Sequence, residues 1–286
     1  MSVRFGTVAV IGAGTMGAGI AQVCAAAGSR VRLVDTEQEL VDRGLAGIAA
    51  FLDKGIAKGK STEADKARVL DAIEGMTDPA GAARAATLVI EAVPEKLALK
   101  RDLFAAVAAA APADAVLATN TSSLSLAAIF ESVPGPGRCL GMHFFNPPPL
   151  MALLEVVRAE RTDAAVVEAV LDYARALGKD PIVVRDSPGF ATSRLGVVLG
   201  LEAIRMVEEE VASPADIDKA MELGYRHPMG PLRLTDLVGL DVRLAIADYL
   251  RTELDSAAFE APQLLRDKVA RGELGKKSGK GFYDWS

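Results

Sequence analysis

The chain has 286 residues, of which 50% are hydrophobic and 24% are charged, so it can bury a core and is not a disordered protein. Its 26 glycines follow no fixed repeat, which excludes a collagen-like chain. A net charge of -6 argues against a broad nucleic-acid-binding surface. Two cysteines, Cys24 and Cys139, lie among apolar residues and match no metal-binding spacing. We therefore expect buried thiols, no metal site and a cytoplasmic protein.

The first elements form the start of a βαβ unit. A β-branched run, 7–11, is followed by a glycine turn, a helix of small residues at 15–27 and a second strand, 31–34, that ends at Asp35. The uncharged stretch 5–29 resembles a membrane span, but its six glycines argue against a lipid-facing helix. Further predicted strands are 88–93, 116–119, 139–144, 153–157 and 182–184, with helices at 97–111 and 164–177. This alternation predicts an α/β fold with a Rossmann-type doubly wound sheet.

Two segments depart from the simple alternation. Between Asp35 and Thr87 the chain is longer than one crossover needs, and it predicts helices at 37–58 and 63–74, the second opened by a capping box of Thr62 and Asp65. We expect an inserted helical hairpin at about residues 37–75. After residue 186 the predicted helices are 191–211, 214–223, 232–250 and 262–271, with no convincing strand. The prediction is a nucleotide-binding domain over 1–186 and an all-α domain over 187–286 that binds substrate and forms a homodimer.

A glycine-rich loop predicts the cofactor. Gly12, Gly14 and Gly17, with Thr15 and Met16 between them, form a GxGxxG that follows a strand and opens a helix. Asp35 ends the next strand, where a carboxylate accepts from a ribose hydroxyl and repels a 2′-phosphate, so NAD is favoured over NADP. The nearby arginines at positions 30 and 32 leave NADP open. An ordinary glycine turn is the alternative to dinucleotide binding.

A histidine and a glutamate form a candidate catalytic pair. His143 lies near the end of one predicted strand, and Glu155 lies in an apolar strand where an ionised carboxylate needs a partner. A hydrogen bond between them would orient the imidazole and stabilise its protonated form, as a base that accepts a hydroxyl proton requires. A purely structural histidine is the alternative. His227 lies among turn-forming residues and is interpreted as a loop residue near a substrate entrance.

Polar residues follow two more predicted strands. Asn120 and Ser122 follow 116–119 and are candidates to bind polar ligand groups, while Ser123 is the expected N-cap of a short helix, 124–130. Glu95 and Lys100 follow 88–93. They form either a solvated pair on the next helix, or a site at which Glu95 meets the nicotinamide ribose.

Taken together, these motifs resemble the 3-hydroxyacyl-CoA dehydrogenase family. The matching segments, in the family's order over essentially the whole chain, are the loop 12–21, EAVPE at 91–95, NTSSL at 120–124, HFFNP at 143–147, DSPGF at 186–190, HPMGP at 227–231 and GKGFY at 279–283. The chain most resembles the short bacterial members that act on 3-hydroxybutyryl-CoA. The resemblance implies reversible NAD-dependent oxidation of a (3S)-3-hydroxyacyl-CoA in fatty acid or butanoate metabolism.

The resemblance also assigns roles to individual residues. It implies that His143 is the catalytic base and Glu155 its partner, and that Ser122 touches the substrate hydroxyl or the cofactor. The positions implied to contact NAD are the loop residues, Asp35, Glu95, Lys100, Asn120, Ser122, Asn146 and Lys277, and those implied to contact acyl-CoA are Lys54, Lys58, Ser122 and Asn146. Ser193 stands where many members have asparagine, so its catalytic contact with the thioester carbonyl has a shorter reach.

Three functional hypotheses follow. The first is the dehydrogenase, acting on 3-hydroxybutyryl-CoA, on longer acyl chains or on a carboxylated group such as 3-hydroxyadipyl. The second keeps the chemistry but takes a free hydroxy acid or sugar acid. The third is an NAD-binding protein without catalytic activity.

Overall fold

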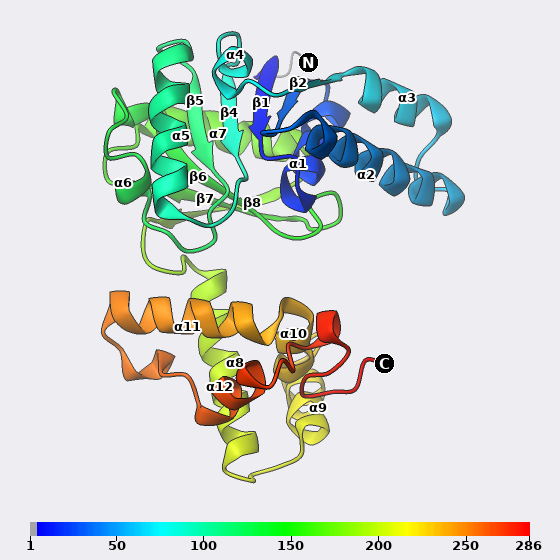
Figure 1. Ribbon diagram of the computed structural model, residues 1–286, viewed down its shortest axis with the longest axis vertical. Helices are drawn as coiled ribbons and strands as arrows, with labels where there is room; N and C mark the ends of the chain where they lie inside the picture. The colour runs from blue at the N-terminus through cyan, green and yellow to red at the C-terminus, as the bar shows by residue number, and fades with distance from the viewer. Residues whose placement is uncertain (1–4) are drawn as a thin grey trace. The chain divides into compact units, whose positions relative to one another are not determined.

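The computed structural model describes residues 5–286, which divide into two compact units that join between Asp186 and Ser187. The first unit is a sheet covered by helices, and the second is built of helices (Figure 1). Each unit has its own hydrophobic core. The predicted fold class, a Rossmann-type sheet followed by a helical region, is confirmed.

Short apolar strands build an eight-stranded sheet. In chain order they are β1 (Thr7–Ile11), β2 (Arg30–Val34), β3 (Ile73–Met76), β4 (Leu88–Glu91), β5 (Val116–Thr119), β6 (Cys139–Phe144), β7 (Leu153–Arg158) and β8 (Asp180–Arg185). The spatial order is β3-β2-β1-β4-β5-β6-β7-β8, and β6 and β7 pair antiparallel while every other pair is parallel. The strand order reverses between β1 and β4. In doubly wound sheets, ligands bind outside the carboxyl ends of the strands at such a switch point.

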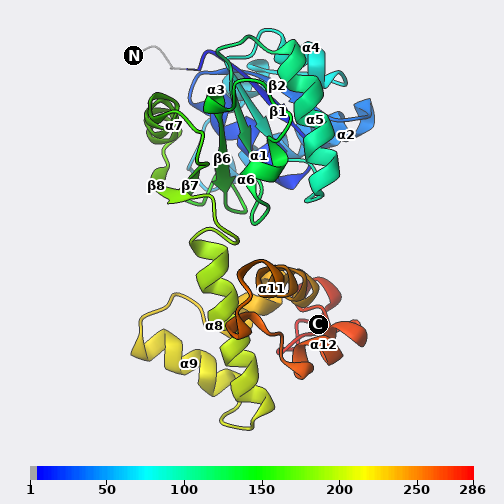
Figure 2. The same ribbon diagram turned by 90° about the vertical axis from the view of Figure 1, so that its left-hand side faces the viewer.

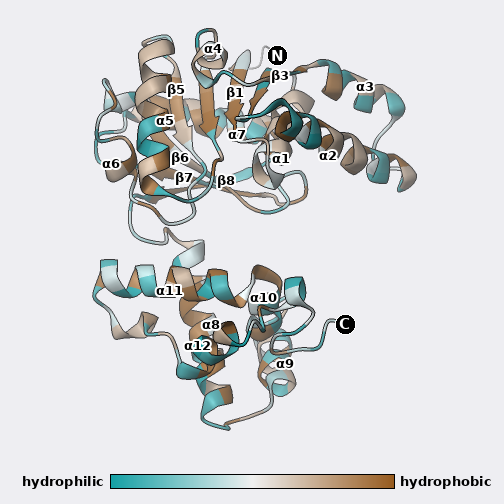
Figure 3. Ribbon diagram, viewed as in Figure 1, coloured by the Kyte–Doolittle hydropathy of each residue, from teal (hydrophilic) through white to brown (hydrophobic). Residues whose placement is uncertain are grey.

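Helices cover both faces of the sheet, as parallel strands require. The helices α1 (Thr15–Ala26), α2 (Gln38–Ala57), α3 (Glu63–Asp71) and α7 (Ala164–Ala176) share one core cluster with the strands. Figure 2 shows α7 and α5 (Leu97–Ala110) on opposite sides of the sheet. The strands are coloured as hydrophobic along most of their length in Figure 3, which agrees with their burial. Both cysteines are buried, as predicted.

The inserted hairpin is present, with one correction. Helices α2 and α3 lie beside the β2–β3 end of the sheet (Figure 1), and Thr62 Oγ1 accepts from the Asp65 amide at 3.1 Å while Asp65 Oδ2 accepts from the Thr62 amide at 3.2 Å. The predicted capping box is therefore confirmed. The predicted helix 63–74 is wrong at its end, because the helix stops at Asp71 and β3 begins at Ile73. The helix-favouring Glu and Ala residues of this segment predicted a helix. The four-residue edge strand is stabilised instead by its hydrogen bonds to β2, which local propensity does not reflect. A short helix, α4 (Pro79–Ala83), follows it and was not predicted.

The second unit packs helices around its own core. They are α8 (Thr192–Glu208), α9 (Pro214–Gly224), α10 (Pro231–Val238), α11 (Leu240–Leu254) and α12 (Gln263–Ala270). The predicted single helix 232–250 is wrong, because Gly239 adopts φ +104° and separates α10 from α11. Its Cβ would lie 3.0 Å from Asp241 Oδ1, so this break suits glycine. Among residues 5–286, none of the helices has the length and apolarity needed to span a membrane.

Candidate active site

His143 and Glu155 form a hydrogen-bonded pair across two strands. The antiparallel register of β6 and β7 places the two residues directly opposite each other, so their side chains share one face of the sheet. His143 Nδ1 lies 2.7 Å from Glu155 Oε2, and the two side chains are 7% and 0% exposed. Because a carboxylate only accepts, Nδ1 carries the hydrogen, and Nε2 is the ring nitrogen that can take up a proton. The predicted hydrogen bond is confirmed, and the catalytic role of the pair stays a prediction.

The three glycines of the GxGxxG loop have different structural roles. Gly12 adopts φ +103°, and a Cβ there would lie 2.6 Å from the Ala92 carbonyl oxygen. A Cβ on Gly17 would overlap the carbonyl of Gly12, so this glycine lets α1 pack against the loop. A Cβ on Gly14 would meet nothing within 4 Å. The loop is thus tight where it turns and packs, and open where a phosphate group would approach.

The start of α1 suits an anion. Gly14 is its N-cap and makes no side-chain hydrogen bond, and the first turn contains no acidic residue. The first amide N–H groups and the positive end of the helix dipole can therefore serve a bound pyrophosphate. On this geometry the residues fit a dinucleotide.

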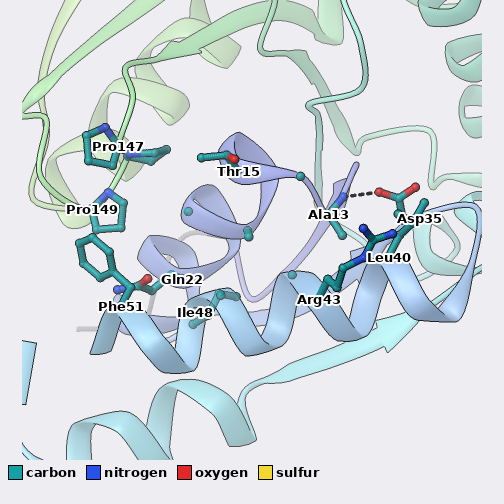
Figure 4. A pocket seen from close by; sticks show the side chains of 16 residues that line it. Ala13, Thr15, Gln22, Asp35, Leu40, Arg43, Ile48, Phe51, Pro147 and Pro149 are labelled. Atoms are coloured by element: carbon teal, nitrogen blue, oxygen red, sulfur yellow. Dashed lines mark hydrogen bonds between the residues drawn. The ribbon is translucent and has the colours of Figure 1, made fainter. Parts of the chain in front are cut away.

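A cavity of about 410 Å³ opens beside this loop. It is lined by the loop, by α1 and α2, by the end of β2 and by the proline-rich segment 147–149. Figure 4 shows Asp35 and Arg43 at one end, with Phe51 and Pro149 at the other. Asp35 Oδ2 accepts from the Ala13 amide at 2.7 Å, which fixes the carboxylate at the loop.

The arginines of β2 lie away from this cavity. Arg30 begins the strand, and Arg32 Nη1 donates to the Ala82 carbonyl at 3.1 Å. Neither lines the cavity, whereas Arg43 does. Arg30 and Arg32 therefore give no reason to expect NADP in this cavity.

Glu95 binds the loop that carries Ser122. Glu95 Oε1 accepts from Thr121 Oγ1 at 2.5 Å and from the Ser122 amide at 2.9 Å. Within residues 5–286, the hydroxyl oxygen of Ser122 makes no hydrogen bond to another residue. Just before it, Asn120 Oδ1 accepts from the Phe144 amide at 2.8 Å and so ties the end of β5 to the end of β6. These contacts gather Glu95, Asn120, Ser122 and His143 at the carboxyl ends of β4, β5 and β6.

One of the two alternatives for Lys100 and the predicted cap of the short helix are wrong. Lys100 is not part of a solvated pair, because its side chain is 1% exposed and its Nζ lies 2.6 Å from Glu91 Oε1 and 3.2 Å from Glu95 Oε2. The buried face of α5 carries it inward. Ser123 does not cap the short helix, which is α6 (Leu126–Ile129), because Ser125 Oγ accepts from the Ala128 amide. The chain stays irregular for two residues longer than predicted.

The remaining predicted contacts lie on several elements of the two units. Lys54 and Lys58 are exposed at the end of α2, Asn146 is exposed after β6, and Met16 is half-buried in α1. Ser193, in the first turn of α8, and Lys277 belong to the second unit, where Lys277 Nζ lies 2.6 Å from Asp241 Oδ1. His227 is half-buried between α9 and α10. The ligand contacts of these residues remain predictions.

Sequence reasoning missed Glu91 and three residues of the cavity wall. Glu91 is fully buried at the end of β4 and binds Lys100. The signal was present, because Glu91 is a carboxylate in an apolar strand, like Glu155. The cavity residues Gln22, Arg43 and Phe51 gave no such signal, since their spacing is that of ordinary helix positions. Within residues 5–286, no cluster of three or more His, Cys, Asp or Glu side chains is placed to hold a metal ion.

Comparison with known proteins identifies the family. A family model described as the NAD-binding domain of 3-hydroxyacyl-CoA dehydrogenase matches residues 7–187, and one described as its C-terminal domain matches residues 189–285. The chain is 41% identical over 278 residues to a 3-hydroxybutyryl-CoA dehydrogenase of Clostridioides difficile, covering 97% of this chain and 99% of that one. It is 43% identical over 286 residues to a 3-hydroxyadipyl-CoA dehydrogenase of Escherichia coli, covering all of this chain but only 60% of that longer protein.

The structural comparison agrees. The solved structure of an (S)-3-hydroxybutyryl-CoA dehydrogenase from Ralstonia eutropha matches with a TM-score of 0.95 at 42% identity and full coverage of both chains. The likeness therefore extends over both units, and its NAD-binding region contains the loop and Asp35 described above. The chain belongs to the 3-hydroxyacyl-CoA dehydrogenase family, and its cofactor is NAD.

Proposed function

We propose that this protein oxidises the 3-hydroxyl of a (3S)-3-hydroxyacyl-CoA to the 3-oxo thioester, with 3-hydroxybutyryl-CoA as the principal substrate. The activity class is that of its family, an NAD-dependent oxidoreductase. The observation that carries the assignment of the reacting groups is the 2.7 Å contact between His143 Nδ1 and Glu155 Oε2.

The chain's own residues supply proton transfer and orientation. His143 accepts the hydroxyl proton at Nε2, because Nδ1 is held by Glu155. The buried carboxylate stabilises the imidazolium that forms, and it holds the ring in one orientation. Bound NAD supplies the hydride acceptor. In the reverse direction His143 returns the proton to the carbonyl oxygen.

Five residues are proposed to hold the substrate. Ser122 hydrogen-bonds the reacting hydroxyl, and its loop position is fixed by Glu95. Asn146 and Ser193 contact the acyl thioester, Ser193 with a shorter reach than asparagine. Exposed lysines at the end of α2, Lys54 and Lys58, offer positive charge to the CoA phosphates within an acidic protein.

His143→Gln tests the assignment of the base. The variant should bind NAD as tightly as the wild type while losing most of its turnover, because glutamine cannot take up the proton. NADH formation with 3-hydroxybutyryl-CoA measures the turnover, and fluorescence titration measures the NAD affinity. A variant that turns over at a near-normal rate would refute the role of His143.

A substrate series separates the remaining alternatives. Rates with 3-hydroxybutyryl-CoA, longer 3-hydroxyacyl-CoAs, 3-hydroxyadipyl-CoA and free 3-hydroxybutyrate should favour the four-carbon thioester. A higher rate with the carboxylated thioester would move the assignment towards the named function of the Escherichia coli relative. Lys58→Glu should raise KM for the thioester and leave the rate with a free acid unchanged.

We also propose a homodimer formed through the second unit, in the cytoplasm. Support comes from large apolar side chains exposed on that unit, among them Leu195 at 68%, Leu223 at 72% and Tyr225 at 75%. An interface between two copies would remove these side chains from water. Light scattering after size-exclusion chromatography should give twice the mass of the chain, and a monomer would contradict the proposal.

A further inference from the structure

A buried amide in the wall of the cavity has no partner. Gln22 lies on α1, is 6% exposed and lines the cavity of about 410 Å³. Figure 4 shows it at the end marked by Phe51, away from Asp35. In the part of the chain that the structure describes, the side-chain amide of Gln22 makes no hydrogen bond to another residue. Because a buried amide without a partner is costly, a polar group of a bound ligand is expected to complete it.

The surroundings of this amide suit a thin, mostly apolar chain. Ile48 and Phe51 of α2 and Pro149 of the proline-rich segment line the same end of the cavity. A Cβ on Gly19 would lie 2.7 Å from Pro148 Cδ, so the glycine lets the proline-rich segment close against α1. Gln22 is therefore one of few polar groups available to a ligand at this end.

The position of Gln22 favours the acyl-CoA over the dinucleotide as its partner. Gln22 lies about 10 Å along α1 from Thr15, and the pyrophosphate belongs at the start of that helix. Asp35, the expected ribose ligand, is also fixed at the loop, by the Ala13 amide. The nicotinamide must reach His143 at the carboxyl ends of the strands, whereas α1 runs away from that edge because it connects the parallel strands β1 and β2.

Gln22 also lies between the contacts proposed for the two ends of the acyl-CoA. Asn146, proposed to contact the thioester, directly precedes the proline-rich segment 147–149. Lys54, proposed to meet the CoA phosphates, follows Phe51 by about one turn of α2. A substrate that meets both passes the end of the cavity that contains Gln22. The part of CoA between its phosphates and its sulfur is the pantetheine arm, an apolar chain interrupted by secondary amides.

We propose that Gln22 recognises an amide of the pantetheine arm and so makes the protein selective for CoA thioesters. A secondary amide offers one donor and one acceptor, and a glutamine side chain offers both in return. The identity of the arm as the ligand rests on the proposed function. The unpartnered amide and the apolar walls around it are properties of the cavity itself.

The test compares thioesters with and without amides. Gln22→Met keeps an unbranched side chain of similar length and removes the amide. It should lower kcat/KM at least about fivefold for 3-hydroxybutyryl-CoA and for 3-hydroxybutyryl-pantetheine, because an amide of the ligand is then buried without a partner. The loss should appear in KM and not in kcat. For S-ethyl 3-hydroxybutanethioate, which has no amide, kcat/KM should change less than about twofold.

Gln38→Met is the matched control. Gln38 is a glutamine at the start of α2 whose Nε2 donates to Asp42 Oδ1 at 2.8 Å, and it does not line the cavity. This variant should leave kcat/KM for all three thioesters close to the wild-type values.

Stability and direct binding give measurements that do not depend on turnover. The Tm of ligand-free Gln22→Met should equal or exceed that of the wild type, because the substitution removes an unpaired buried amide. In calorimetric titrations with CoA, the variant should bind at least about fivefold more weakly than the wild type. Its NAD affinity, measured by fluorescence titration, should change less than about twofold. If Gln22→Met does not fold, the same measurements are made on Gln22→Leu.

Three results would overturn the role of Gln22. They are an equal loss of kcat/KM for the ethyl thioester, unchanged kcat/KM for the CoA thioester, and weakened binding of NAD with unchanged binding of CoA. If the wild type oxidises none of the thioesters, the proposed function fails, while the titration with CoA still tests the recognition of the arm.

Discussion

Glu155→Gln isolates the contribution of a buried carboxylate to proton transfer. The substitution keeps the size of the side chain and removes the charge that faces the imidazolium. A charge-assisted hydrogen bond contributes about 1.5–3 kcal/mol, and two opposite charges about 4 Å apart attract by about 4 kcal/mol at an effective dielectric constant near 20. Since 1.36 kcal/mol corresponds to a tenfold change, kcat should fall between about 10- and 1,000-fold.

The assay is the initial rate of NADH formation at saturating NAD and 3-hydroxybutyryl-CoA. KM for both substrates should stay close to the wild-type values, because the charge acts on the proton-transfer step and not on binding. Asp218→Asn is a matched control, since Asp218 is a buried carboxylate that accepts from the amides of Leu232 and Arg233 in the second unit. It should reduce stability and leave kcat close to the wild-type value.

A fall of less than about threefold in kcat would refute the reasoning, because it lies below the smallest loss expected for a charge-assisted hydrogen bond. An equal loss in Asp218→Asn would show that general destabilisation, and not the charge on His143, accounts for the effect. Normal turnover by both variants would show that the charge of Glu155 takes no part in the reaction.

Three further predictions concern the cofactor, the thiols and the response to acid. Asp35→Asn should weaken NAD binding about tenfold and narrow the preference over NADP, because the ribose loses its charged acceptor; unchanged titrations with both cofactors would contradict this. Burial raises the pKa of Cys24 and of Cys139 to about 12, so a thiol reagent in mildly alkaline buffer should label neither until the protein unfolds. Lys280 and two further cations lower the pKa of Glu273 from 4.5 to about 2. The ionised carboxylate therefore stabilises the fold above pH 4.5, and this stabilisation is lost as the pH falls towards 2. The difference in Tm between the wild type and Glu273→Gln should shrink over that range. A difference that stays constant would refute the ion pairing.

The parts of the fold that strong local patterns encode were predictable. The β-branched runs and the glycine loop placed β1, α1 and β2 within a residue or two, and the Thr62 capping box placed the start of α3. The elements that were missed depend on tertiary contacts. Strand β3 forms because it hydrogen-bonds to β2. Helices α10 and α11 are separate because Gly239 adopts a positive φ, which the helix-favouring residues around it do not predict.

In the site, too, some residues could be predicted from local patterns and others depend on tertiary packing. His143 and Glu155 could be paired from sequence because an ionisable group in an apolar strand needs a partner. Glu91 carried the same signal, but its partner Lys100 lies on a helix whose amphipathic pattern is weak, so a solvated Lys100 stayed open as one of two alternatives. Burial of Lys100 follows from how α5 packs on the sheet, which a sequence pattern alone does not determine.

The antiparallel pairing of β6 and β7 has a consequence for how the pair of His143 and Glu155 tolerates changes in chain length. His143 and Glu155 face each other through strand register, and the segment between the strands, 145–152, takes no part in that alignment. Residues can therefore be added to that connecting segment without separating the pair. A single deletion inside either strand would turn one of the two side chains to the opposite face of the sheet. The dyad is thus robust to variation in the loop that joins its two members and intolerant of length changes in the strands that carry them.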